Sequence, residues 1–301
     1  NGVVWKCTKK DGKEFVAKVT CNPKFGPFKV DAVKSELDII EKLNEIKKSE
    51  DEFEKYFLPY KKSGKSGTDS RVIIKTSLAD EGDLNGYVKK PGSKVSLLKI
   101  INMFTQCAMG VEILLRKGYS HNDIKPENLF VLKKVSGKVT NNESKGSGSR
   151  SSADSKISED GSEVDLKIAD FGAMTKIDST RKVFVNRHFC APDCYKLSKD
   201  AVAKRDVYSL GLCALYFLFG GKSTSYHKIA KDLTVKYKDD IESFIIDNLL
   251  DQKYGDDLIL HKFLQVIQKM VKSDHNERID IKEAVPELKE LTNPQKNIGG
   301  V

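Results

Sequence analysis

The chain has 301 residues, of which 39% are hydrophobic and 32% are charged, a balance typical of a globular protein with a sizeable core and one or two domains. Its 52 basic and 43 acidic residues give a net charge of +9, but the lysines are spread along the chain without a basic block, so we expect no specific nucleic-acid site. The longest apolar run, 207–219, is too short to cross a bilayer, and we expect no membrane span.

The cysteine pattern indicates a reduced, intracellular and cytoplasmic protein. None of the six cysteines forms a C-x-x-C pair, so the spacing of a zinc ribbon is absent. Several lie in apolar runs, where cysteine acts as a small buried hydrophobe. Cys190 and Cys194 are four residues apart and could be neighbours on a helix. For this pair we favour a structural role over metal or redox chemistry.

The first part of the chain is expected to form a β-hairpin. Two β-rich runs, 3–7 and 14–20, flank a turn that contains Asp11-Gly12, a strong hairpin signal. Lys18 interrupts the second apolar run. It either points to solvent from an edge strand or lies over the phosphates of a nucleotide.

A helix is predicted over 30–47, because apolar residues recur there at helical spacing. Glu36 lies beside its apolar face, where a carboxylate needs a partner, and it is either a boundary surface charge or the partner of Lys18. Next, 61–70 is predicted to be a polar hairpin turn and 71–76 a strand. A second helix is predicted over 96–116.

One segment interrupts this regular pattern. Residues 133–163 are dominated by Ser, Gly, Lys and Asn, so they cannot bury enough apolar surface to order themselves. We interpret 133–163 as a low-complexity insertion on the surface of one domain, and 292–301 as a flexible tail.

The most informative stretch is 121–128. Asp123, Lys125 and Asn128 fall within six consecutive residues, and Asp170 follows downstream in Asp170-Phe171-Gly172. A carboxylate that orients a hydroxyl, a cation that neutralises phosphoryl charge, and two oxygen donors for Mg²⁺ are what phosphoryl transfer from a metal nucleotide needs. The spacing therefore predicts a phosphoryl-transfer site.

Further motifs occur in one consistent order along the chain. The segment 190–193 is similar to an A-P-E motif with Asp193 in place of Glu, Asp206 lies in a following apolar stretch, and Arg278 could pair with Asp193. With the motifs above, these resemble the eukaryotic protein kinase superfamily of the Ser/Thr type. The resemblance implies an α+β, bilobal kinase fold. It divides the chain into a small β-rich N-lobe, 1–77, which starts within or after a glycine-rich loop and lacks its first strand, and a larger helical C-lobe, 78–291.

The resemblance also implies roles in catalysis. Asp123 would orient the substrate hydroxyl, and Lys125 would bind the γ-phosphate. Lys18 would hold the α- and β-phosphates, with Glu36 orienting it. Asn128 and Asp170 would hold Mg²⁺, which prefers oxygen ligands. Asp206 would brace the catalytic-loop backbone, while His121 is expected to be a packed support residue.

A nucleotide pocket follows from the same resemblance. Ala17 and Phe130 would enclose the adenine from two sides, and Val4 would cover it. Thr76 would be the gatekeeper at the back of the pocket. The other implied contacts are the hinge and the ribose-binding residue, namely Ser77, Leu78, Ala79 and Asp83.

The implied function is an ATP- and Mg²⁺-dependent kinase that transfers the γ-phosphate to Ser/Thr hydroxyls of protein substrates. The alternatives are a pseudokinase that acts as scaffold or allosteric regulator, and a small-molecule kinase of similar fold. Asn122 stands where the family has Arg before the catalytic Asp, which predicts a non-RD kinase without a phosphate-reading switch. Val185-Asn186 replaces the usual Gly-Thr, and only Gly2 remains of a glycine-rich loop.

Overall fold

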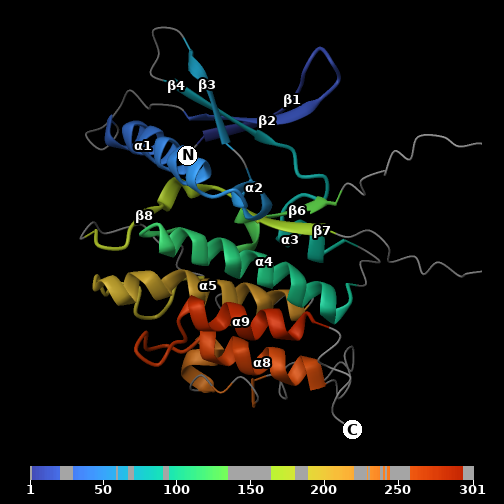
Figure 1. The fold of residues 1–301 in the computed structure, drawn as a ribbon, viewed down its shortest axis with the longest axis vertical. Coiled ribbons are helices and arrows are strands. Elements are labelled where there is room, and N and C mark those ends of the chain that lie inside the picture. The colour runs from blue at the N-terminus through green and yellow to red at the C-terminus, as the bar shows by residue number, and fades with distance from the viewer. Residues whose placement is uncertain are drawn as a thin grey trace, which may run out of the picture.

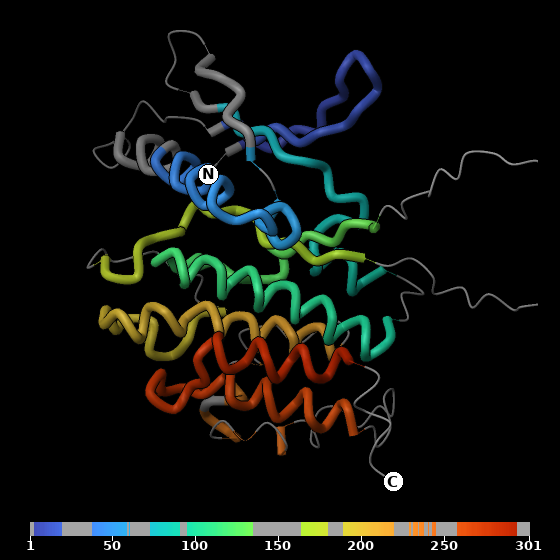
Figure 2. The backbone as a smooth tube through the Cα atoms, in the orientation of Figure 1, coloured from blue at the N-terminus to red at the C-terminus, as the bar shows by residue number. Residues whose placement is uncertain are grey.

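A computed structural model describes most of the chain (Figure 2). The described residues are 2–20, 30–58, 60–66, 71–90, 95–134, 164–179, 189–219, 229, 231–237, 240, 243–244 and 258–293, of which 2, 20, 30–37, 61–66, 71–72 and 234 are described for the backbone alone. A β-sheet with one flanking helix lies above a stack of helices (Figure 1). This arrangement agrees with the expected α+β fold, and the predicted boundary at 77/78 falls where the fourth strand ends.

The N-terminal region is a four-stranded antiparallel sheet in the order β1-β2-β4-β3. Its strands are β1 (Gly2–Thr8), β2 (Glu14–Thr20), β3 (Tyr60–Ser66) and β4 (Arg71–Ser77). The predicted first hairpin is confirmed. Its turn closes with Lys9 N donating to Lys13 O at 2.8 Å, and Gly12 has a φ of +81°, which glycine adopts without strain.

Helix α1 (Val30–Ser49) lies against this sheet (Figure 1). Ile40 and Leu43 are buried, as the helical spacing predicted, and Ile40 packs with Ile74 and Tyr60 of the sheet. The short helix α2 (Phe53–Tyr56) follows. The turn predicted over 61–70 is wrong in its first part, because 60–66 forms strand β3 and pairs with β4. The ladder with β4 overrides the turn preference of the Gly and Ser residues.

The C-terminal region is a stack of helices (Figure 1). They are α3 (Leu84–Val88), α4 (Leu97–Arg116), α5 (Lys199–Leu218), a π-helix (Asp232–Lys236), α8 (Leu258–Met270) and α9 (Ile281–Leu291). By length and composition α4 is apolar enough to cross a membrane, but 67% of its most apolar window is buried within the fold. It packs against α5 and α9, as the core helix of a folded domain does.

The start of helix α5 is marked by an N-cap. The helix begins at Lys199, where the Ser198 hydroxyl accepts a hydrogen bond from Ala201 N. Asp206 therefore lies inside the helix. Further along, a Cβ at Gly211 would come within 2.6 Å of Val271 Cγ1, so glycine permits the close packing of α5 and α8.

Two small antiparallel ribbons join the two regions. Strand β5 (Tyr119–Ser120) pairs with β8 (Thr175–Lys176), and β6 (Leu129–Lys133) pairs with β7 (Val164–Ile168). The 3₁₀ turns Pro126–Asn128 and Phe171–Ala173 lie at their ends. The second ribbon brings 121–128 beside 169–172, and the insertion predicted at 133–163 falls almost entirely outside the described residues.

Candidate active site

The loop 121–128 is held by one buried carboxylate. Asp206 is fully buried and accepts hydrogen bonds from Ser120 Oγ at 2.9 Å, His121 N at 2.6 Å and Asn122 N at 2.8 Å. Three donors to a carboxylate offset much of its desolvation. Asn122 adopts a left-handed backbone with φ +62°. The predicted bracing role of Asp206 is confirmed.

Asp123 is fixed by the two polar residues that follow it. Its Oδ2 atom accepts from Lys125 Nζ and from Asn128 Nδ2, each at 2.8 Å. Asn128 Nδ2 also donates to Asp123 O at 2.8 Å, which ties the carboxamide to the loop backbone. Among the described residues no hydrogen bond reaches Asp123 Oδ1, and the side chain is 19% exposed. The two donors to Oδ2 thus fix the orientation of the carboxylate, and Oδ1 remains accessible as an acceptor.

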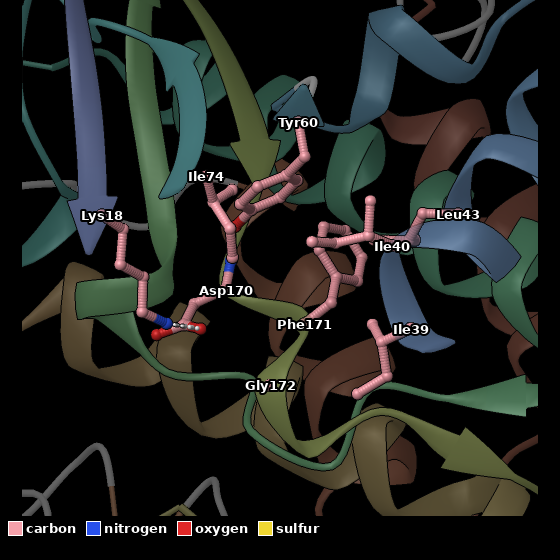
Figure 3. Close-up of a pocket in the computed structure, with 9 residues that line it drawn as sticks. All are labelled: Lys18, Ile39, Ile40, Leu43, Tyr60, Ile74, Asp170, Phe171 and Gly172. Carbon is pink, nitrogen blue, oxygen red and sulfur yellow. Dashed lines mark hydrogen bonds and ion pairs between the residues drawn. The ribbon is translucent and has the colours of Figure 1, made fainter. Parts of the chain in front are cut away.

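Lys18 and Asp170 bring the sheet and the loop together. The Lys18 ammonium lies 3.0 Å from Asp170 Oδ1 (Figure 3), although 152 residues separate them. Burial works against the charged carboxylate, but the Lys18 ammonium holds the pKa of Asp170 below its usual range. Asp170 also has a left-handed φ of +58°, and its N–H donates to the Tyr60 hydroxyl.

Phe171 lies in an aromatic cluster beneath this pair. Its ring centroid is 5.0 Å from that of His121, 5.6 Å from Tyr60 and 5.7 Å from Phe57. Burial lowers the pKa of His121, so its imidazole is neutral near pH 7. The hydrogen bonds assign the tautomer, with Nε2 donating to Ala169 O at 3.1 Å and Nδ1 accepting from Asp123 N at 3.3 Å. His121 supports the loop, as expected.

A pocket opens beside the Lys18–Asp170 pair (Figure 3). Apolar side chains from α1 and the sheet form one wall, and the two charged groups form another. Its lining residues are Lys18, Ile39, Ile40, Leu43, Tyr60, Ile74, Asp170, Phe171 and Gly172. The charged pair is therefore screened from water on its apolar side, which strengthens electrostatic interactions there.

The strand register corrects one predicted nucleotide contact. Lys18 pairs with Val4 and Ile74, and Val16 pairs with Thr76. Directly opposite residues share a face and successive residues alternate. Val16, Lys18 and Thr76 therefore lie on one face, while Ala17 lies on the other and is buried there. Ala17 thus does not share the face of Lys18, whereas Val16, two residues before Lys18, does, and strand alternation alone was the signal that would have shown this.

The predicted hinge residues lie at the end of strand β4 and directly after it. Ser77 is its last residue, and Asp83 forms a bridge with Phe130, so the residue predicted to bind the ribose lies beside one predicted to enclose the adenine. Asp83 Oδ1 accepts from Gly86 N at 2.7 Å and caps α3. Sequence reasoning gave Asp83 only a ribose contact and missed this capping role, although Asp before a short helix is a common cap signal.

Thr76 carries an unusual polar atom. Within the described part of the chain, its Oγ1 atom is buried and has no hydrogen-bond partner. Buried hydroxyl groups are nearly always satisfied, so a polar ligand beside Thr76 would account for this one. The Glu36 side chain and Val185-Asn186 lie outside the described residues, and their roles stay predictions. Val4 is 62% exposed on the same face as Lys18.

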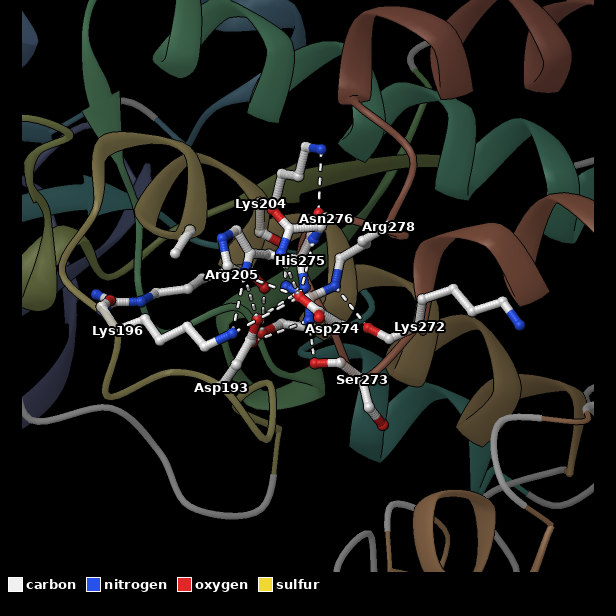
Figure 4. A network of polar contacts seen from close by, with 12 residues as sticks. Asp193, Lys196, Lys204, Arg205, Lys272, Ser273, Asp274, His275, Asn276 and Arg278 are labelled. Atoms are coloured by element: carbon white, nitrogen blue, oxygen red, sulfur yellow. Dashed lines mark hydrogen bonds and ion pairs between the residues drawn. The ribbon is translucent and has the colours of Figure 1, made fainter.

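A second polar network anchors the segment after the loop (Figure 4). Arg278 Nη2 donates to Asp193 Oδ1 at 2.9 Å, and the Arg278 side chain is fully buried. This confirms the predicted pair. His275, which the sequence did not single out, donates its N–H to Asp193 Oδ2 at 2.8 Å. Asp193, Asp274 and His275 could geometrically hold a cation, but Arg278 and Lys196 already neutralise these carboxylates, and we assign no metal here.

Comparison with known proteins identifies the family. A family profile described as "Protein kinase domain" matches residues 1–287, so the chain belongs to the protein kinase family. It is 25% identical over 170 residues to Wee1-like protein kinase 2 of Xenopus tropicalis, which is 54% of this chain and 28% of that protein. It is 30% identical over 119 residues to the G-type lectin S-receptor-like serine/threonine-protein kinase RKS1 of Arabidopsis thaliana, which is 38% of this chain and 14% of that protein.

A third relative covers a shorter stretch. The chain is 33% identical over 67 residues to serine/threonine-protein kinase ATG1a of Arabidopsis thaliana, which is 22% of this chain and 10% of that protein. The chain thus spans about a quarter or less of these relatives' length. The protein kinase match covers both the small β-sheet region and the helical region of this chain.

Proposed function

We propose that this chain is an ATP- and Mg²⁺-dependent protein kinase that transfers a γ-phosphate to Ser/Thr hydroxyls of protein substrates. One observation carries the proposal. Asp123 is locked by Lys125 and Asn128 with one accessible oxygen, in a chain whose Lys18 and Asp170 also meet. Membership of the protein kinase family supports this reading, and two relatives carry serine/threonine-protein kinase in their names.

The proposed roles follow from the hydrogen bonds. Asp123 Oδ1 would accept the proton of a substrate hydroxyl, while the two donors to Oδ2 fix the carboxylate's orientation. Lys125 would shift from Asp123 toward the transferred phosphoryl group, as a flexible ammonium can. Lys18, released from Asp170, would bind the nucleotide phosphates. The main catalytic contribution is then positioning and charge stabilisation.

The residues present fit a magnesium nucleotide. Asn128 uses its amide nitrogen for Asp123, which leaves its carbonyl oxygen for a cation, and the pKa of Asp170 is held low by Lys18 against the effect of burial. Two such oxygen donors suit Mg²⁺. When bound, Mg²⁺–ATP supplies the activated phosphoryl group and neutralises its charge. The Thr76 hydroxyl, which has no hydrogen-bond partner among the described residues, supports a polar ligand at the back of the pocket.

Asp170→Asn is expected to remove most of the Mg²⁺ dependence of ATP binding. Ligand binding at about 100 times its Kd stabilises the folded state by ~2.7 kcal/mol, so ATP with Mg²⁺ should raise the Tm of the wild type clearly above that with ATP and EDTA. In the variant the two Tm values should converge. The matched control is Asp178→Asn, an exposed carboxylate of the same region, which should retain the wild-type difference. If the Tm difference between Mg²⁺ and EDTA were equal in the Asp170 variant and the wild type, the assignment of Asp170 as a Mg²⁺ ligand would be contradicted.

Asn122 supports the proposal that the kinase is of the non-RD type. Its Nδ2 atom donates to Ser120 O at 3.1 Å, Ala173 O at 3.2 Å and Thr175 Oγ1 at 3.0 Å. A neutral carboxamide thus ties the catalytic loop to the segment after Phe171. An arginine at this position would instead need an anion, such as a phosphate, as its partner.

Phosphatase treatment is accordingly expected to leave the initial rate of phosphotransfer unchanged. The Asn122 side chain makes its loop contacts with backbone and hydroxyl groups, so removal of a loop phosphate takes no partner from it. The assay compares enzyme treated with a broad-specificity phosphatase and enzyme treated with the heat-killed phosphatase. An order-of-magnitude loss after treatment, restored by autophosphorylation, would overturn the non-RD proposal.

A further inference from the structure

Two cysteines lie together on an anchored turn outside the active site. Cys190 and Cys194 are both half-buried, and Cys194 N donates to Ala191 O at 2.9 Å, which closes a turn between them. The turn is held at both ends. Ser209 Oγ donates to Phe189 O at 2.8 Å on one side, and the buried Asp193–Arg278 pair holds the other. The backbone therefore presents the two thiols to each other without a folding rearrangement.

The two thiols are also in contact. Each cysteine acts on the pKa of the other, which is raised for Cys190 and lowered for Cys194. The four-residue spacing allows the pair to be neighbours on a helix, and the sequence favours a structural role. The structure places the pair on a turn instead, ahead of α5, where both sulfur atoms keep some access to solvent.

A buried arginine beside the pair has an unused donor. Arg205 is 4% exposed, and its Nη2 atom donates to Lys196 O at 2.6 Å (Figure 4). Within the described part of the chain its Nε atom is buried without a hydrogen-bond partner. A buried guanidinium N–H without an acceptor is costly. The Arg205 charge acts on both cysteines, and the Asp206 and Asp193 carboxylates act on Arg205, so a Cys194 thiolate would be a further anion beside this guanidinium.

The electrostatic environment shifts the pKa values of the two thiols in opposite directions. The neighbouring Cys190 side chain lowers the pKa of Cys194 to about 7, and Arg205 acts in the same direction, while burial and the Asp193 carboxylate oppose it. The Cys194 side chain in turn raises the pKa of Cys190, and burial acts in the same direction. One thiol is thus prepared as a nucleophile and its neighbour stays protonated, which is the arrangement of an attacking and a resolving cysteine.

We propose that Cys190 and Cys194 form a dithiol modification site at which a hydroperoxide drives formation of an intramolecular disulfide. The Cys194 thiolate attacks the peroxide O–O bond and becomes a sulfenic acid, and the leaving hydroxide takes up a proton to form water. The Cys190 thiol then attacks the Cys194 sulfur, and the S–O bond breaks with release of a second water. Two thiols and one hydrogen peroxide yield one disulfide and two waters. The proposal concerns the thiols alone and does not depend on phosphotransfer.

Hydrogen peroxide treatment of the full chain provides the first test. After oxidation, blocking of free thiols and trypsin digestion, both cysteines fall in one peptide, 188–196. We expect this peptide to lose the mass of two hydrogen atoms and to regain it with a reductant. Cys190→Ser should instead leave a trappable sulfenic acid on Cys194, while Cys194→Ser should leave Cys190 unmodified. The proposal would be overturned if both thiols of peptide 188–196 were found blocked, and therefore still reduced, under conditions that oxidise Cys7.

Alkylation kinetics provide the second test and need no oxidant. The iodoacetamide labelling rate of Cys194 should rise with pH about a midpoint near 7. Cys190→Ala removes the neighbouring thiol that lowers the pKa of Cys194 and should move the midpoint toward the ordinary thiol value of about 8.5. Half-exposed Cys7 is the internal control, and Cys107 and Cys213, whose pKa values are raised by complete burial, should stay unlabelled. A midpoint that is the same with and without the Cys190 thiol would contradict the pairing.

Discussion

Replacing Asp123 by Asn is expected to lower the phosphotransfer rate by roughly two to four orders of magnitude, the range for loss of a positioned acid–base group. The carboxylate accepts hydrogen bonds from Lys125 and Asn128 through Oδ2 and keeps Oδ1 accessible. A carboxamide has only one acceptor oxygen, so it cannot satisfy both donors and also accept from a substrate hydroxyl. Single-turnover measurement with labelled ATP gives the rate directly.

Nucleotide binding serves as the control for this variant. Asp123 does not belong to the Lys18–Asp170 pair, so the ATP-dependent rise in Tm should survive in Asp123→Asn. Asp178→Asn should keep both the rate and the rise in Tm. If Asp123→Asn transferred phosphate as fast as the wild type, Asp123 would not be the residue that orients the hydroxyl.

Arg278→Ala is expected to destabilise the fold by about 3–5 kcal/mol, the range for breaking a buried ion pair. The arginine donates to Asp193 and also to three backbone carbonyls, with Nε to Lys272 O at 2.8 Å, Nη1 to Lys204 O at 3.1 Å and Nη2 to Ser273 O at 3.0 Å. Truncation leaves these acceptors and the Asp193 carboxylate buried without their partner. Urea unfolding at neutral pH measures the loss.

A surface ion pair offers the matched comparison. Lys269 Nζ lies 2.8 Å from Glu287 with its side chain 51% exposed, and Lys269→Ala should cost less than about 1 kcal/mol because water screens the pair. Equal losses for Arg278→Ala and Lys269→Ala would contradict the structural role given to the Asp193–Arg278 pair.

Much of the site could be predicted from the sequence because its residues occur in short motifs. Asp123, Lys125 and Asn128 lie on one loop, so their closeness follows from spacing alone. The pairing of Asp193 with Arg278 was inferred from motif order, and the structure confirms it. The first hairpin followed from Asp11-Gly12, whose conformational preference is local.

The remaining features depend on contacts distant along the chain. Strand alternation places Val16 on the face of Lys18, but which residues of β4 lie opposite them is set by the pairing of β2 with β4, because a shift of one residue exchanges the two faces. The position of Arg205 beside Cys190 and Cys194 depends on the turn that carries the two cysteines, and no local sequence pattern predicts it. The Gly- and Ser-containing stretch 60–66 became a strand because β4 lies beside it.

The most direct test of the account is transfer of labelled γ-phosphate from ATP to generic basic proteins, with and without Mg²⁺, followed by phosphoamino acid analysis. The wild type should place label on serine and threonine only when Mg²⁺ is present, and Asp123→Asn should reduce it to background. The wild type could instead transfer no more phosphate than Asp123→Asn while ATP still stabilises it. That result would contradict the proposed kinase activity and favour a nucleotide-binding scaffold.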